Sequence, residues 1–280
     1  MVLRSPDDLG TVFVGAPSRV VDLLAAAPDS PAPVLHRSSA ALYVEVAGRC
    51  VGVVAPQAAR VPCALRLPAA TSAGVSATEV LAVEPLSPYV ERGTLYLTGN
   101  PLRLGRFVDV RVPRIDPSRV LRAASPATAV ARPPRPAAGG VGLAAHSALS
   151  ALRELPPLGT TIDDALLRQL VGRGGGLTPL GDDVLCGWLA VLVATARLDE
   201  AVSQAVREAL PRTTVLSATL LECALHGEVL PEFATYVLAL GTPDEDSAAR
   251  ALTSIGHTSG AGLWWGAEHA LAMMAAEEAA

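Results

Sequence analysis

The sequence changes character along its length, and this change constrains the fold more than any other feature. Up to residue 112, short apolar or alternating runs are separated by Pro and Gly, as in the strands of a small barrel or sandwich. From residue 141 onward, apolar residues recur at helical spacing. Residues 125–140 read SPATAVARPPRPAAGG, which is typical of a linker. We therefore predict an α+β chain with a β-rich N-terminal domain over 1–123, a Pro/Ala-rich linker over 124–140 and an α-helical domain over 141–280.

The same patterns place the individual elements. The predicted strands are Leu42–Val46, Arg49–Val54, Cys63–Leu67, Thr94–Leu97 and Phe107–Val112, with one helix at Ser18–Ala26. The predicted helices of the second half are Val141–Leu155, Ile162–Val171, Asp182–Leu198, Glu200–Leu210, Thr214–His226, Glu232–Leu240, Ser247–Ile255 and Ala261–Ala276.

Composition excludes several classes of protein. Half of the residues are hydrophobic but only 4% are aromatic, so the core must consist mainly of Ala, Val and Leu. A net charge of −5 argues against a general nucleic-acid binder. The longest strongly apolar stretch, Val184–Ala196, is too short to cross a bilayer, and the four cysteines form no CxxC pair. These features predict a cytoplasmic protein with no membrane or nucleic-acid partner.

The most informative segment is the glycine-rich loop, residues 172–183, which reads GRGGGLTPLGDD. Five glycines fall within ten residues, which indicates positive φ angles or close backbone approach. The loop also leads into an apolar helix, whose N-terminus offers free N–H groups and a positive dipole end. We therefore predict that this loop binds an anion such as a phosphate or carboxylate. The predicted ligand contacts are Arg173, Gly174, Gly175, Gly176, Thr178 and Gly181.

Two acidic residues at the end of the loop leave alternatives open. Asp182 and Asp183 could cap the helix, or hold a divalent cation such as Mg²⁺ that bridges to a bound phosphate. Arg173 offers a bidentate contact to a phosphate or carboxylate, and Thr178 offers a hydroxyl. A purely structural glycine loop is the other interpretation. The spacing matches neither the P-loop nor the dinucleotide-binding GxGxxG pattern.

Two later segments also combine hydroxyls and glycines at helix starts. Thr213, Thr214 and Ser217 share one face of a predicted helix. The segment 256–260 reads GHTSG and opens the last helix. We predict that this segment faces the same pocket as the glycine-rich loop, where His257 would donate to a ligand oxygen or act as an acid–base group.

Three motifs, GGGLTPLGDD, SATLLECALHGE and IGHTSGAGLWWG, resemble the AllH-like family. One branch of that family is associated with oxamate carbamoyltransferase, which interconverts oxamate plus carbamoyl phosphate with oxalurate plus phosphate. Leu180 stands where the family usually has Ser, and Gly262 lies near a position where it commonly has Asp. The resemblance implies a ligand loop made of Gly174, Gly176, Thr178, Gly181, Asp182 and Asp183, with Ser217, Thr219, His257, Thr258 and Ser259 on the opposite side of the site.

Three functional hypotheses follow from these observations. The first is a subunit or relative of a carbamoyltransferase that binds a small anionic substrate, such as carbamoyl phosphate or oxamate, and acts with partner subunits. Such catalysis would depend on positioning and charge stabilisation rather than on a covalent nucleophile. The second is a non-catalytic ligand-binding or assembly subunit. The third is a Mg-dependent phosphotransfer enzyme that uses Asp182 and Asp183.

Overall fold

The computed structural model describes residues 11–115 and 164–278. The chain divides into two compact units, Met1–Val110 and Arg111–Ala280. The described strands belong to the first unit, whereas the described part of the second unit is helical, so the predicted α+β class is confirmed. The predicted linker over 124–140 and the predicted helix over 141–155 lie outside the described residues.

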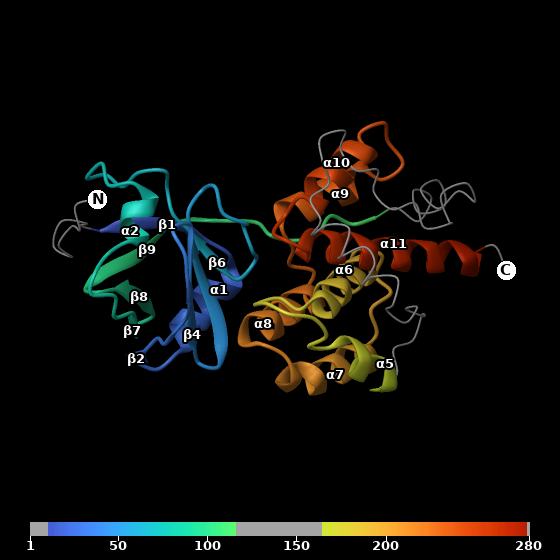
Figure 1. The fold of residues 1–280 in the computed structure, drawn as a ribbon, viewed down its shortest axis with the longest axis horizontal. Helices are drawn as coiled ribbons and strands as arrows, with labels where there is room; N and C mark the ends of the chain where they lie inside the picture. Colours follow the sequence, from blue (N-terminus) through green and yellow to red (C-terminus); the bar gives the residue numbers. More distant parts are fainter. Residues whose placement is uncertain (1–10, 116–163, 279–280) are drawn as a thin grey trace. The chain divides into compact units, whose positions relative to one another are not determined.

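The N-terminal unit is a curled, half-barrel sheet of nine strands (Figure 1). Its strand order is β2-β7-β8-β9-β1-β6-β5-β4-β3. The β1–β9 and β5–β6 pairs are parallel, and the other pairs are antiparallel. The strands are β1 (Val12–Ala16), β2 (Ser30–Pro31), β3 (Val34–Arg37), β4 (Ala41–Val46), β5 (Arg49–Val54), β6 (Ala64–Arg66), β7 (Tyr89–Glu91), β8 (Thr94–Leu97) and β9 (Asn100–Phe107).

Two-residue turns explain much of this sheet. Ala47-Gly48 joins β4 to β5, and both residues have positive φ angles, 48° and 74°. The same combination joins β7 to β8 and β8 to β9. Turns with two positive φ angles match the natural twist of an antiparallel pair, and a glycine in the second position adopts such an angle without strain.

The N-terminal core confirms the composition argument. Its buried cluster consists only of Val, Leu and Ala, from the strands, from α1 (Ser18–Ala26) and α2 (Ala77–Leu81), and from the segments between them. Helix α1 has the bounds predicted from the sequence. The predicted strand Phe107–Val112 is wrong, because β9 ends at Phe107 and the strand lies earlier in the chain. The sequence pattern did not predict β9, because the strand contains Pro101 and its second half is exposed without alternation.

The C-terminal unit contains the seven predicted helices that follow residue 160, with ends shifted by up to four residues. These are α5 (Asp164–Leu170), α6 (Leu180–Ala194), α7 (Glu200–Ala209), the 3₁₀ turn η2 (Leu210–Arg212), α8 (Val215–Leu225), α9 (Pro231–Ala239), α10 (Glu245–Thr253) and α11 (Ser259–Glu278).

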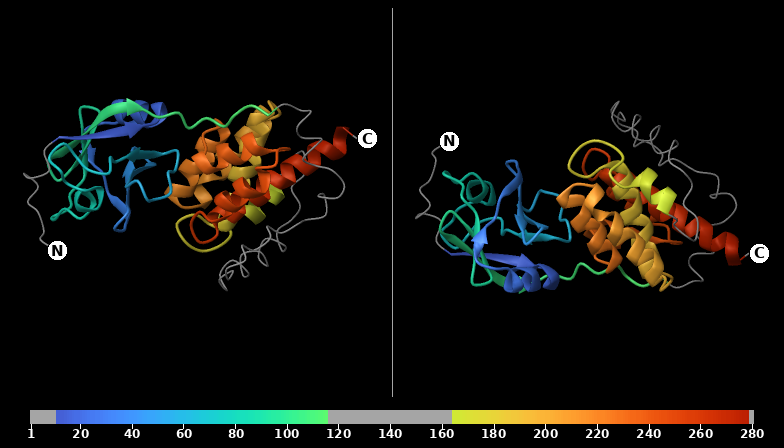
Figure 2. Two further views of the ribbon diagram at one scale, coloured as in Figure 1. Left: turned by 90° about the horizontal axis from the view of Figure 1, so that it is seen from above. Right: turned by 90° about the horizontal axis from the view of Figure 1, so that it is seen from below.

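Helix α6 lies at the centre of this unit, and every residue in it except Val193 is buried. Its main neighbour is α11, which runs beside it in the views of Figures 1 and 2. Glycines allow the two backbones to approach closely. A Cβ atom at Gly187 would lie 2.0 Å from the carbonyl oxygen of Leu263, and one at Gly266 would lie 1.9 Å from that of Val184.

Two further observations concern the cysteines and the hydropathy of the helices. All four cysteines are buried. Among the described helices, none combines the length and the hydropathy that crossing a membrane requires.

The contact between α6 and α11 gives a first prediction. We expect Gly187→Ala to lower the free energy of unfolding by about 1–3 kcal/mol, because the added methyl group must push the helices apart. This cost exceeds the gain of about 1 kcal/mol that Ala normally brings to a helix interior. Urea denaturation would measure the change. The control is Gly175→Ala, where a Cβ atom has nothing within 4 Å. Equal stability of both variants and the parent would contradict the role of Gly187.

Candidate functional site

The glycine-rich loop connects α5 to α6. Helix α6 begins at Leu180, two residues before the predicted start, and its N-cap is Pro179 without a side-chain cap bond. Asp182 and Asp183 are therefore the third and fourth residues of the helix and not its cap. Both are buried, with exposed fractions of 1% and 4%. Two carboxyl groups this deeply buried need an explanation beyond helix capping.

The fold requires most of the loop glycines, but not all of them. Gly172 and Gly174 have φ angles of 75° and 118°, and a Cβ atom at either would lie within 2.8 Å of a backbone atom. Gly181 lies against the Leu170 carbonyl oxygen, 2.1 Å from a Cβ atom placed there. Gly176 has a positive φ but open space around it, and Gly175 has open space without a positive φ. Gly175 thus has no local steric reason to be glycine.

Asp182 connects the loop to the start of α8. Its Oδ1 accepts a hydrogen bond from the Gly172 N–H at 2.8 Å, and its Oδ2 accepts one from the Thr213 hydroxyl at 2.5 Å. The Ser217 hydroxyl also bonds to this carboxyl group. Both oxygens are therefore engaged by the protein, which indicates a structural role for Asp182.

Asp183 connects the loop to α11. The hydroxyls of Ser259 and Thr178 both interact with its carboxyl group, and these two hydroxyls lie 2.8 Å apart. The Oδ2 atom of Asp183 is buried and has no hydrogen-bond partner among the described residues. A buried oxygen of this kind is rare in proteins and is a candidate for contact with a ligand.

Burial controls the protonation of both carboxyl groups. It raises the pKa of Asp182, an effect that the bonds from Thr213, Gly172 and Ser217 oppose. It raises the pKa of Asp183 well above its usual value, and the neighbouring Asp182 charge adds to the increase, whereas the hydroxyls of Ser259 and Thr178 oppose it. Desolvation penalises the charged form of a carboxyl group, so Asp183 is the more strongly affected of the two.

The start of α8 contacts the loop through its cap. Thr214 is the N-cap of α8; its hydroxyl accepts from the Ser217 N–H and donates to the Leu177 carbonyl oxygen at 2.6 Å. Ser217 is buried and its hydroxyl faces Asp182. The Thr219 hydroxyl donates to the Val215 carbonyl oxygen of its own helix. Of the two predicted contacts on this helix, Ser217 is thus connected to the loop.

The segment 256–260 lies next to the loop, although the two are about 80 residues apart in the sequence. Ser259, the first residue of α11, provides the connection through its bond to Thr178. Thr258 is half-buried, and His257 is exposed on the preceding turn, where its imidazole makes no hydrogen bond to a described residue. The role predicted for His257 therefore stays a prediction.

Gly262 explains one departure from the family pattern. A Cβ atom at this position would lie 2.7 Å from the Cβ atom of Asp183 and 3.1 Å from Cδ1 of Leu180. A carboxylate side chain at 262 would overlap Asp183. Leu180 and Gly262, the two departures noted in the sequence, therefore contact each other here.

The backbone N–H groups of the loop fall into two sets. Those of Gly181, Asp182 and Asp183, at the helix start, already donate to the carbonyl oxygens of Arg173 and Pro179. Those of residues 174–178 have no hydrogen-bond partner among the described residues, and residues 174–177 are exposed. Amides without a partner among the described residues thus lie in the glycine loop, which includes most of the predicted anion contacts.

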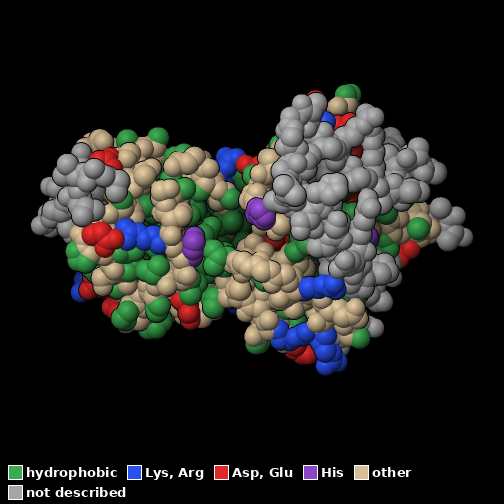
Figure 3. All heavy atoms as spheres, in the orientation of Figure 1, with side chains coloured by type: hydrophobic (Ala, Val, Ile, Leu, Met, Phe, Trp, Pro, Cys, Tyr) green, Lys and Arg blue, Asp and Glu red, His purple; other side chains and the backbone are tan. Residues whose placement is uncertain are grey.

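Basic side chains flank this loop. Arg173 is exposed within it, and the backbone of Arg212 packs against Gly172. The Arg212 guanidinium donates to the Arg168 carbonyl oxygen at 3.0 Å, which places η2 beside the end of α5. Figure 3 shows arginines gathered on the part of the helical unit where Figure 1 draws α5 and α7. This distribution favours a negatively charged ligand.

The metal hypothesis finds less support. No group of three or more His, Cys, Asp or Glu side chains with the arrangement of a metal site occurs among the described residues. Of the two aspartates, only Asp183 has an oxygen without a partner among those residues. Asp183, Thr178 and Ser259 fit a hydrogen-bonding site better than a carboxylate pair for Mg²⁺.

A second buried polar cluster escaped the sequence reading. Tyr236 of α9 donates a hydrogen bond to Glu268 of α11, and burial raises the pKa of both groups. The charge of Glu245 raises both pKa values further. Because these residues come from three different helices, no spacing in the sequence could have predicted their contact.

The burial of Asp183 predicts a dependence of stability on pH. Its folded pKa lies above the unfolded value of about 3.9, so the carboxyl group favours folding most below that pH and loses this effect as the pH rises through the folded pKa. We expect the stability of Asp183→Asn relative to the parent to increase between pH 4 and pH 8, because Asn does not titrate. Urea denaturation at both pH values measures the difference, with Asp246→Asn on the exposed start of α10 as control. A difference that does not change with pH would show that Asp183 remains ionised.

Comparison with known proteins finds a similarity that covers this site. The family model described as "Oxamate carbamoyltransferase subunit AllH" matches residues 170–271, which include the loop, α8 and the start of α11. No curated protein and no solved structure matches the chain. Residues 170–271 are therefore similar to the AllH family, and the resemblance of the motifs to that family is confirmed.

Proposed function

We propose that this chain is a carbamoyltransferase subunit, or a relative of one, whose glycine-rich loop binds a small anionic substrate such as carbamoyl phosphate or oxamate. The relation to an oxamate carbamoyltransferase subunit comes from the family match. The observation that carries the proposed site is the run of exposed amides at residues 174–178, next to Arg173 and free of protein partners among the described residues.

The chemistry of the loop suits a substrate with two kinds of polar group. Successive backbone N–H groups attract phosphate or carboxylate oxygens, and Arg173 adds a positive charge. Asp183 Oδ2 offers an acceptor for an N–H group when ionised, or a donor for an oxygen when protonated. Carbamoyl phosphate and oxamate each carry both an amide group and anionic oxygens, so either could contact the loop and Asp183 together.

The proposed catalytic contribution is positioning and charge stabilisation. In carbamoyl transfer, the acceptor nitrogen forms a bond to the carbamoyl carbon, phosphate leaves with the electron pair of the broken C–O bond, and the nitrogen releases a proton. The loop amides and Arg173 would stabilise the departing phosphate. His257, exposed on the turn before α11, is our candidate for the group that takes the proton.

A non-catalytic ligand-binding or assembly subunit is the second candidate. The engagement of both Asp182 oxygens by protein donors favours it, because that carboxyl group holds the loop together instead of facing a ligand. The family description also names a subunit, which implies partner chains that could carry out the chemistry. In this second hypothesis the glycine-rich loop is structural and the chemistry occurs on partner chains, so neither the loop nor His257 would matter for turnover.

Calorimetric titration with carbamoyl phosphate, phosphate and oxamate tests the proposed site. We expect saturable binding of at least one of them, and an affinity about tenfold lower in Arg173→Gln, because one charge-assisted contact is lost. The matched control is Arg250→Gln, on the exposed surface of α10, which should bind as the parent does. Absence of binding to the folded chain, both alone and with its partner subunits, would refute the proposal.

A further inference from the structure

Strand β9 has an open edge although it is an inner strand of the sheet. On one side, β1 pairs with β9 from Leu102 to Phe107. On the other side, β8 pairs only with Asn100, Pro101 and Leu102. Residues 103–107 therefore have no strand partner on the β8 side within the described part of the chain, and all five are exposed.

The register shows which backbone groups face this opening. The two-residue turn after Leu97 makes Leu97 and Asn100 a hydrogen-bonded pair, so Leu95 and Leu102 form the next such pair. Two residues further along β9, the backbone of Leu104 has the same orientation as that of Leu102. Its N–H and C=O groups point to the side where β8 has already ended, so they are available to another strand.

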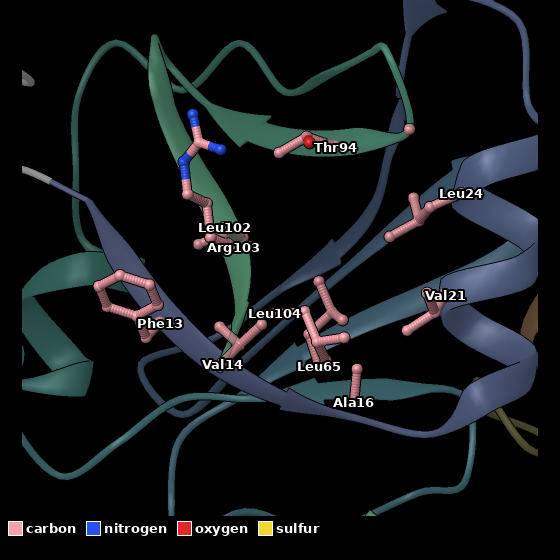
Figure 4. A pocket seen from close by; sticks show the side chains of 11 residues that line it. Phe13, Val14, Ala16, Val21, Leu24, Leu65, Thr94, Leu102, Arg103 and Leu104 are labelled. Carbon is pink, nitrogen blue, oxygen red and sulfur yellow. The ribbon is translucent and has the colours of Figure 1, made fainter. Parts of the chain in front are cut away.

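A cavity lies beside this edge, within the N-terminal unit. Figure 4 shows β8 and β9 diverging, with Leu65 and Leu104 on one side of the space and Val21 and Leu24 of α1 on the other. The cavity has a volume of about 280 Å³. That is slightly below the range of about 300–1,000 Å³ common for small-molecule pockets, so the cavity suits an inserted side chain better than a separate ligand.

The exposed surface around the edge is apolar and basic. Leu104, Phe107 and the adjacent Phe13 of β1 are 41%, 66% and 55% exposed. Arg103 and Arg106 are also exposed, and neither forms an ion pair with a described residue. A second copy of this chain would bring its own arginines against these two, which opposes self-pairing. An acidic strand would be complementary.

We propose that the open edge of β9, residues 103–107, binds an extended acidic segment of a partner protein as an added strand. The backbone of Leu104 supplies hydrogen bonds, and an apolar side chain of the segment fills the cavity. Acidic residues of the segment would lie beside Arg103, which also lines the cavity, and beside Arg106. This inference depends on the N-terminal unit alone and is independent of the function proposed for the glycine-rich loop.

Fluorescence anisotropy with the full chain tests the proposal. The probe is a fluorescein-labelled, eight-residue peptide of alternating Glu and Val; the comparison peptide alternates Lys and Val. We expect saturable binding of the Glu–Val peptide only, and an affinity at least about tenfold lower in the variant Arg103→Glu/Arg106→Glu. The matched control, Arg49→Glu/Arg250→Glu, makes the same change in net charge at exposed arginines outside the edge and should bind normally.

Hydrogen exchange provides a second measurement that does not depend on charge. Addition of the Glu–Val peptide should slow hydrogen exchange of the Leu104 amide, because that N–H would then donate a hydrogen bond to the peptide backbone. Three results would overturn the proposal: no binding of the Glu–Val peptide, equal binding of the Lys–Val peptide, or unchanged exchange at Leu104. A stable dimer of the free chain that Arg103→Glu disrupts would also overturn it, since the edge would then bind a second copy.

Discussion

The close contact between α6 and α11 organises the helical unit. Gly187 and Gly266 remove the side chains that would otherwise separate the two backbones, and Gly262 allows Asp183 to pack beneath α11. This approach places Ser259 against Thr178 and Asp183, so a loop and a helix start that are distant in sequence become one polar site. The geometry of the site therefore depends on helix packing more than on the loop itself.

The two neighbouring aspartates illustrate different uses of the same side chain. Asp182 has a donor for each oxygen and stabilises the loop from within. Asp183 keeps one oxygen buried and without a partner among the described residues, at a cost in folding free energy. Proteins commonly retain a buried polar atom without a partner where a bound molecule supplies the missing hydrogen bond. The contrast between the two carboxyl groups is the reason for placing the ligand beside Asp183.

The sequence predicted the positions of helices and strands better than the contacts between them. Helical periodicity located α5 to α11, and the short apolar runs located β4, β5 and β8, because these signals are local. The strand β9 was misplaced, since its exposed half lacks alternation. In the site, the clustering of glycine and hydroxyl residues correctly indicated that Thr178 and Ser259 belong together. The partners of Asp182, the free edge of Leu104 and the Tyr236–Glu268 pair arise from long-range packing, which no local pattern encodes.

The parallel pairing of β1 with β9 has a consequence for the order in which the N-terminal unit forms. The paired residues 12–16 and 102–107 belong to the first and the last described strand of the unit, and the other described strands lie between them in the sequence. Pairs this far apart in sequence form slowly, because a long loop must close before they contribute any stability. During synthesis, β1 must therefore wait for β9 to leave the ribosome, while the hairpins between them can already form.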